Sequence, residues 1–225
     1  MDNGDVREFS TRTEAAYARL REDILSGALK PAEKLRLEHL RQVYGFGLSS
    51  LREALSKLSS ERLVHTTGQR GYWVEPISRD EFQDLVRMRL LLEPQALEWS
   101  IDKATPDWEE QVEEVYRRLE QVENSLDRDR EGLSKVWETE NRAFHHALIR
   151  NCGSEWMLHF VKTLIEQSER YRRQAVAHSA VPKDVLRAEH SAIYEAALAR
   201  QGRLAAELLR VHISNSATSL EATLF

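Results

Sequence analysis

Apolar residues recur at helical spacing in three segments near the start of the chain, 13–26, 37–44 and 48–62. A turn with two glycines separates the second segment from the third and predicts a sharp change of direction. Two short β-like segments, 64–67 and 71–74, then predict a hairpin. This order of elements predicts a winged helix-turn-helix over residues 13–75, whose third helix would enter the major groove of DNA.

The third helix and the hairpin carry side chains that are suited to contact with DNA. Ser49 or Ser50 is expected to cap the helix, and small polar residues there let a phosphate approach the backbone N–H groups. Basic side chains further along the helix and at the hairpin tip would reach phosphates or guanine edges. The candidate DNA contacts are Ser49, Ser50, Arg52, Lys57, Gln69, Arg70 and Gly71. The alternative is an ordinary helical hairpin followed by a β-turn.

Motifs in this region resemble those of the GntR family of bacterial transcription factors. The resemblance is carried by LREAL at Leu51–Leu55, ERLV at Glu61–Val64 and the wing GQRGYWV at 68–74. Leu48, Ser50 and Arg62 depart from the family pattern, because arginine, proline and glycine are usual there. The form GLSSLREALSKLSSERLV is closer to a subgroup that includes the carbon-starvation-induced regulator. The resemblance implies a winged DNA-binding domain whose half-site differs from the commonest family operator.

From residue 79 onward the apolar spacing is helical throughout. Six helices are predicted, over residues 79–101, 106–126, 133–150, 155–173, 183–200 and 204–219. Their apolar stripes and short connections are typical of an antiparallel bundle, and Pro94 should bend the first helix or break a hydrogen bond in it. The predicted fold is therefore mainly α. Its parts are a disordered N-terminus (1–12), the winged helix-turn-helix (13–75), a short linker (76–79) that couples the two domains, and an all-α bundle (80–225).

Composition and charge limit the class of protein. Of the 225 residues, 41% are hydrophobic, and no apolar run is long enough to cross a membrane. The single cysteine, Cys152, cannot form an intramolecular disulfide, and no signal-peptide pattern precedes the first helix, so a soluble cytoplasmic protein is expected. The net charge of −5 argues weakly against nucleic acid, but residues 1–78 carry +1 and residues 79–225 carry −6. A near-neutral DNA-binding domain remains workable, because local patches contact the phosphates.

Three histidines on different predicted helices of the bundle could converge on one metal ion. His145 follows Asn141 by one helical turn, so both project from the same face, and His146 points elsewhere. The candidate ligands are Asn141, His145, His190 and His212. Three imidazoles and one oxygen-bearing side chain could hold a divalent cation. Each histidine taken alone is more often a packed or surface residue.

The bundle also resembles the FCD effector domain, the helical ligand-binding half of the FadR-type GntR subfamily. The matching segments are Glu140–Leu148 (ENRAFHHAL), Glu189–Ile193 (EHSAI) and Leu209–Ile213 (LRVHI). The resemblance implies a bound zinc, nickel or similar ion, with Asn141 standing where an aspartate is usual. Arg89 and Glu93 resemble a signature of the domain's first helix, which implies that Arg89 lies near the effector and could clamp an organic acid. An intrahelical pair between Arg89 and Glu93 is the alternative.

Together these patterns predict a transcription regulator rather than an enzyme. The predicted protein is a homodimeric repressor that binds double-stranded operator DNA and responds to a small carboxylate effector bound near a divalent metal. Two rivals remain from the residues alone. One is a helical-bundle metalloenzyme with a histidine-bound ion that activates water. The other is a metal-free dimerisation scaffold without an effector.

Overall fold

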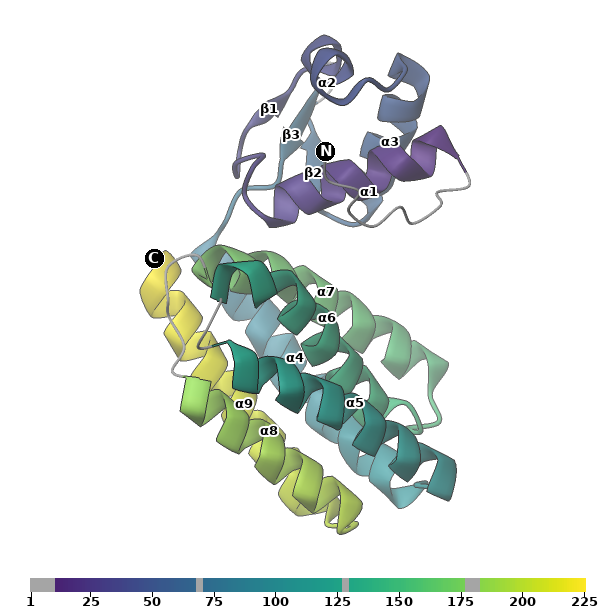
Figure 1. Cartoon of the computed structure of the whole chain (residues 1–225), viewed down its shortest axis with the longest axis vertical. Helices are drawn as coiled ribbons and strands as arrows, with labels where there is room; N and C mark the ends of the chain where they lie inside the picture. Colours follow the sequence, from purple (N-terminus) through teal and green to yellow (C-terminus); the bar gives the residue numbers. More distant parts are fainter. Residues whose placement is uncertain (1–10, 68–70, 127–129, 177–182) are drawn as a thin grey trace. The chain divides into compact units, whose positions relative to one another are not determined.

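The structure is a computed structural model that describes residues 11–67, 71–126, 130–176 and 183–225, and it divides into two compact units, 1–77 and 78–225. Within its described residues, the N-terminal unit comprises α1 (Arg12–Leu25), β1 (Lys34–Leu35), α2 (Leu37–Tyr44), α3 (Leu48–Ser60), β2 (Val64–Thr66) and β3 (Tyr72–Val74) (Figure 1). β3 lies between β1 and β2 and is antiparallel to both, with Trp73 opposite Lys34 and His65. This arrangement confirms the predicted winged helix-turn-helix.

α1 begins earlier than its apolar stripe indicated. Thr11, two residues before the predicted start of the helix, is the N-cap: its hydroxyl accepts a hydrogen bond from the N–H of Glu14, and the Glu14 carboxylate accepts one from the N–H of Thr11. This reciprocal pair is a capping box. Thr13 instead lies inside the helix and donates its hydroxyl to Glu53 of α3 at 2.9 Å.

The turn between α2 and α3 depends on two glycines. Gly45 ends α2 with a left-handed φ of +71°, a conformation that residues with a Cβ rarely adopt. Gly47 is the N-cap of α3 and provides no side-chain hydrogen bond. The prediction that Ser49 or Ser50 caps α3 is therefore wrong, since the helix begins at Leu48 and both serines lie in its first turn.

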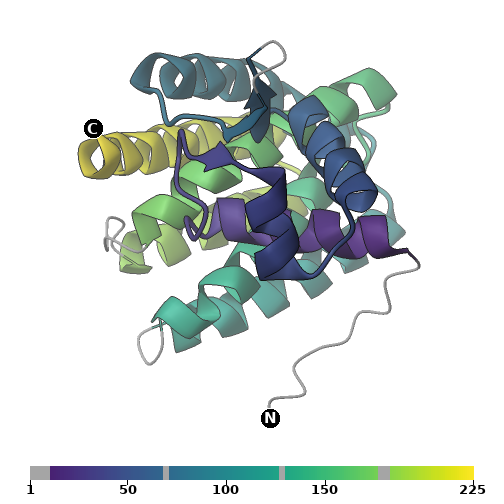
Figure 2. The same cartoon turned by 90° about the horizontal axis from the view of Figure 1, so that it is seen from above.

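One hydrophobic core unites the N-terminal unit. Fully buried apolar side chains come from α1 and α3, and others come from α2 and all three strands: Leu20, Leu25, Leu35, Leu40, Leu51, Leu55, Leu58, Val64 and Val74. The sheet lies at one side of the three helices (Figure 2). β1 was not predicted from the sequence, because a strand of two residues is too short to show alternation.

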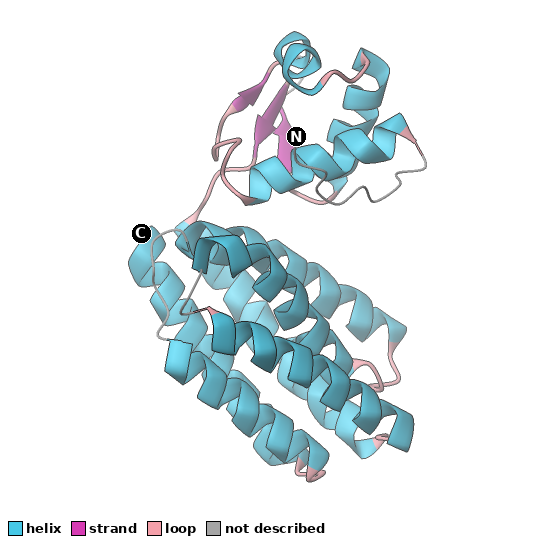
Figure 3. Cartoon of the chain, viewed as in Figure 1, coloured by secondary structure: helices cyan, strands magenta, loops and turns pink. Residues whose placement is uncertain are grey.

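The C-terminal unit is helical wherever it is regular among its described residues (Figure 3). Its helices are α4 (Arg79–Asp102), α5 (Pro106–Ser125), α6 (Arg130–Ile149), α7 (Glu155–Val176), α8 (Lys183–Leu198) and α9 (Gly202–Leu224). α4 packs beside α6, α7 and α9, while α5 packs beside α6 and α8, around a core that includes Trp108 and Phe144. The predicted all-α bundle is confirmed. Within the described residues, no helix has the length and apolar character required to cross a membrane.

Some helix boundaries differ from the predicted ones. α6 begins at Arg130, since its first three residues, Arg-Glu-Gly, add nothing to the apolar stripe from which the prediction was made, and α9 continues past the predicted end to Leu224. Pro94 lies inside α4 without ending it. Because proline has no N–H, the carbonyl of Leu90 loses its usual helical partner there.

Candidate functional site

Three buried histidines from three helices meet inside the bundle. His145 lies on α6, His190 on α8 and His212 on α9, and one ring nitrogen of each lies within 4.8 Å of the others. All three residues are at most 5% exposed. Of the four predicted ligands, the structure brings these three together, and Asn141 lines a small cavity with His145 and His212.

Two carboxylates orient two of these rings. The Nδ1 of His190 lies 2.8 Å from Glu123 of α5, and the Nδ1 of His212 lies 2.8 Å from Glu189 of α8. Because an ionised carboxylate only accepts, each Nδ1–H donates, and in the neutral form of either ring Nε2 is the nitrogen that can bind a metal. The Nε2 of His190 is buried and has no hydrogen-bond partner. A metal ion bound to this nitrogen would satisfy it.

The electrostatics keep two of the rings neutral at pH 7. Burial lowers the pKa of His145 well below its usual value, and His212 and His190 lower it further. Burial also lowers the pKa of His212 to about 4, against the opposing effect of its bond to Glu189. Neutral imidazoles are the form that binds metals.

The donor set therefore fits a divalent metal ion. Three imidazole nitrogens suit zinc, nickel, copper or iron, and carboxylates that hold the far nitrogen of a ligating histidine are typical of such sites. Among the described residues, His145, His190 and His212 are the group of three or more potential ligands that lie close enough to share one ion. The amide of Asn141 is 4% exposed and faces the same cavity, so its role as a fourth ligand stays a prediction.

The cavity beside the histidines is small. Its volume is about 30 Å³, which is room for roughly two water molecules. Its lining includes Phe82, Val86 and Arg89 from α4. Arg89 was predicted to clamp an effector, but its Nε donates to Glu93 at 2.5 Å and its Nη2 donates to the other carboxylate oxygen at 3.2 Å. The intrahelical pair, which was the alternative, is therefore what the structure contains.

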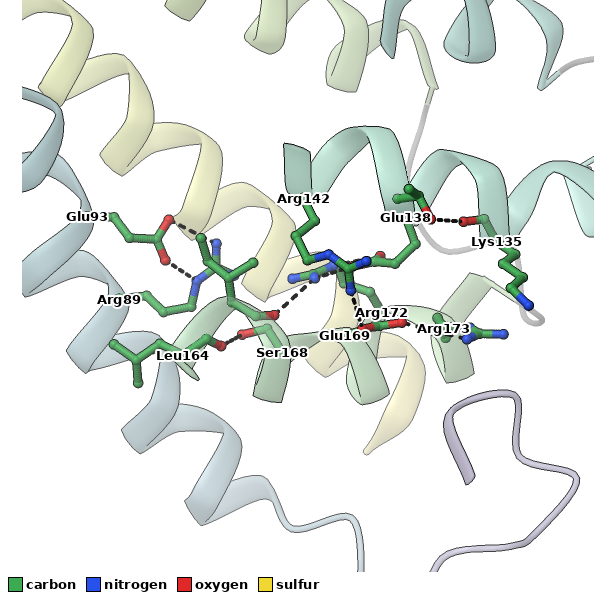
Figure 4. A network of polar contacts seen from close by, with 12 residues as sticks. Arg89, Glu93, Lys135, Glu138, Arg142, Leu164, Ser168, Glu169, Arg172 and Arg173 are labelled. Carbon is green, nitrogen blue, oxygen red and sulfur yellow. Dashed lines mark hydrogen bonds and ion pairs between the residues drawn. The ribbon is translucent and has the colours of Figure 1, made fainter. Parts of the chain in front are cut away.

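A network of buried ion pairs borders this cavity (Figure 4). Arg172 of α7 lines the cavity, and its guanidinium pairs with Glu138 of α6, with Nε donating at 3.0 Å. Arg142 of α6 pairs with Glu169 of α7 at 3.2 Å. Sequence reasoning missed Arg172 and Glu138. One signal was present, since Glu138 lies three residues before Asn141 and so shares its inward face.

Glu123 was also missed, although the sequence contained a signal for it. It follows Leu119 by four residues on the apolar stripe of α5, where a charged residue requires a buried partner. That partner is His190, and the Glu123 carboxylate also accepts a hydrogen bond from Nε1 of Trp137 at 3.2 Å.

The predicted DNA contacts differ in their exposure and surroundings. Ser49 and Arg52 are exposed near the start of α3, and Ser50 is half-buried. Lys57 is exposed but lies over the ring of Tyr17, 3.9 Å from its centroid, which directs its ammonium toward α1. Gly71 has a left-handed φ of +112° at the start of the second wing segment. Gln69 and Arg70 lie outside the described residues.

Comparison with family models gives matches to both units. Residues 12–74 match the model described as bacterial regulatory proteins, gntR family, and residues 84–215 match the FCD domain. Among curated proteins, the HTH-type transcriptional regulator BphR of Paraburkholderia xenovorans (strain LB400) is 40% identical over 203 residues, which are 90% of this chain and 82% of that protein. The HTH-type transcriptional repressor GlaR of Escherichia coli (strain K12) is 32% identical over 200 residues, 88% of this chain and 90% of that protein.

Solved structures with the same fold are more distant in sequence. E. coli McbR/YncC has a TM-score of 0.73 at 19% identity, covering 94% of this chain and 98% of that one. A GntR transcriptional regulator from Rhodococcus sp. RHA1 has a TM-score of 0.75 at 20% identity, covering 95% and 99%. At these identities the likeness shows the fold alone.

Proposed function

Because the chain belongs to the GntR family of bacterial transcriptional regulators and joins its DNA-binding domain to an FCD domain, we propose that it is a homodimeric repressor whose DNA affinity is set by a small carboxylate bound at a divalent metal. Its relatives are transcriptional regulators, so the protein is a DNA-binding regulator and not an enzyme. The name of the E. coli relative, a transcriptional repressor, supports repression rather than activation.

The observation that carries the metal proposal is the unpartnered, buried Nε2 of His190 beside the rings of His145 and His212. An ion held by these nitrogens would supply positive charge and open coordination positions for a ligand carboxylate. Zinc and nickel both suit the donor set. Glu123 and Glu189 fix the two rings that they touch, so the nitrogens are oriented before the ion arrives.

The size of the cavity supports a link between ligand and DNA binding. A volume of about 30 Å³ is too small for an organic acid, so binding must move side chains of the lining. Phe82 and Val86 of that lining lie in the first two turns of α4, and α4 directly follows the linker to the winged domain. A ligand that binds better when these turns shift would therefore favour one state of the linker.

An exposed apolar surface supports the homodimer. We give the name α4–α7 face to five exposed apolar side chains on these two packed helices, Met88, Leu91, Trp99, Trp156 and Phe160, whose exposed fractions lie between 38% and 73%. Met88 and Trp99 follow Glu81 by two and five helical turns, so they lie on the side of α4 where Glu81 meets α7.

The size of this face fits a second copy of the chain. The exposed parts of its five side chains amount to on the order of 500 Å², a large share of the roughly 800 Å² per partner in a stable interface. An apolar patch of that size is also at the upper end for a monomer. Phe160→Ser should therefore shift the protein toward monomer in light scattering. Val185→Ser, at a 47% exposed position on α8, should not.

Elemental analysis tests the metal site. We expect about one zinc or nickel ion per chain in the purified protein and its loss in His190→Ala. A mobility-shift assay with operator DNA should then show that carboxylates weaken DNA binding by the metal-loaded protein. Protein that holds no metal as purified, and whose DNA binding does not respond to carboxylates even after zinc or nickel is added, would favour the scaffold alternative.

A further inference from the structure

A second and much larger cavity lies against another face of α6. It opens between α5, α6 and α7 and has a volume of about 500 Å³, against about 30 Å³ beside the metal centre. We call it the outer pocket. His145 of α6 lines the metal-centre cavity, whereas its neighbour His146 lines the outer pocket. The volume lies within the range of small-molecule sites, roughly 300 to 1,000 Å³.

The walls of the outer pocket combine apolar and cationic groups. Val115, Ala147 and Leu158 provide apolar surface from three helices, and each packs against the bundle core. Arg150, which directly follows α6, and Lys162 on α7 provide positive charge from two different parts of the chain. A few polar groups that converge over an apolar wall are typical of ligand sites.

These two cations are poorly neutralised by the protein. Arg150 is exposed and forms no ion pair with any described residue. Lys162 is 60% exposed and has only a long contact of 4.0 Å with Glu166. Of the two acids in the lining, Glu114 pairs with Arg118, which also pairs with Glu140, and Glu155 forms no ion pair with Arg150 or Lys162 among the described residues. Both cations therefore remain able to bind the anionic group of a ligand.

The geometry does not favour a metal ion in this pocket. His146 and His159 both line it, but among the described residues only the three histidines of the bundle interior lie close enough to share an ion. A cationic rim above an apolar wall instead matches an anion that carries a compact apolar body.

We propose that the outer pocket is a second small-molecule site, separate from the metal centre, that binds an organic carboxylate with a compact apolar body. Arg150 and Lys162 hold the carboxylate, and the body packs on Val115, Ala147 and Leu158. Both the charge and the body are required.

Isothermal titration of the full-length protein with benzoate tests this assignment. Acetate supplies the charge without the body, and benzyl alcohol supplies the body without the charge. Benzoate should bind saturably below about 10 mM, and the two partial probes should bind at least tenfold more weakly. The variant Arg150→Gln/Lys162→Gln should lose at least tenfold in benzoate affinity. The matched control Arg203→Gln removes a 97% exposed arginine of α9 outside the pocket and should bind as the wild type does.

The metal centre provides the second control. Benzoate should bind equally to EDTA-treated protein and to His190→Ala, since neither change touches the outer pocket. Binding that disappears with the metal would place benzoate at the histidines and overturn the proposal. Unchanged affinity in the double variant, or no binding at about 10 mM, would overturn it as well.

Discussion

The carboxylate of Glu123 offers a sharp test of the metal centre. Its side chain is 2% exposed, lies 2.8 Å from Nδ1 of His190 and accepts the indole N–H of Trp137. Glu123→Gln keeps the shape of the side chain and removes its charge. An amide raises the basicity of the ring less than a carboxylate does, so Nε2 of His190 becomes a weaker ligand.

The expected loss follows from this arrangement. Replacing the partner of a ligating histidine typically weakens metal binding 10- to 100-fold, which is about 1.4 to 2.8 kcal/mol. We expect the upper half of that range for Glu123, because its burial leaves no water to replace the lost charge. Glu189→Gln should lose less, since the Glu189 side chain is 14% exposed and solvent screens it.

Competition with a chromophoric chelator measures the zinc affinity of each variant. Urea unfolding of the metal-free proteins shows whether Glu123→Gln has also changed stability, which is expected because the new amide N–H needs a buried acceptor. Glu113→Gln, at an exposed position of α5, serves as the control and should match the wild type. If folded Glu123→Gln binds zinc within a factor of two of the wild type, Glu123 does not act on the metal through His190.

Three further outcomes are expected. Arg62 has a φ of +55°, so Arg62→Gly should raise the free energy of unfolding by about 1 kcal/mol in urea; a destabilised variant would contradict this. In metal-free protein, the pKa of His212 is about 4 when folded and about 6.5 when unfolded. The unfolded state therefore takes up a proton first, and up to about 3 kcal/mol of stability present above pH 6.5 should be lost as the pH falls toward 4, as denaturant titrations would show. Arg52→Ala should weaken operator binding and its salt dependence in mobility shifts more than Lys57→Ala, whose ammonium faces Tyr17; equal effects would contradict the placement of Lys57.

The sequence was sufficient for those features that depend on spacing within one element. Helical periodicity predicted every helix of the structure, and the Gly45–Gly47 turn and the wing followed from local residue types. The histidines could be placed on inward faces for the same reason. The start of α1 was predicted two residues late although the sequence contained a signal for it, since Glu14 follows Thr11 by three residues in the capping-box pattern, whereas Ala16 follows Thr13.

Contacts between helices could not be predicted from the spacing of residues along the sequence. That Glu123 on α5 would meet His190 on α8, or Glu138 on α6 would meet Arg172 on α7, depends on which faces oppose each other and at what height. A single sequence contains no record of that alignment. It shows only that a charged residue on an apolar stripe requires a partner somewhere in the core.

The buried ion pairs imply that the metal, rather than Arg89, provides the attraction for an effector. Arg89 and Arg172 both line the cavity, but each guanidinium already holds a carboxylate of its own, Glu93 or Glu138. A ligand carboxylate that displaced the glutamate from either guanidinium would leave that buried glutamate unpaired, at a cost of about 3 to 5 kcal/mol. That is comparable to the whole binding free energy of a ligand with a millimolar Kd, about 4 kcal/mol. The DNA binding of EDTA-treated protein should therefore no longer respond to the effector, although both arginines remain. A response that survived metal removal would show that one of these two arginines leaves its glutamate to bind the ligand.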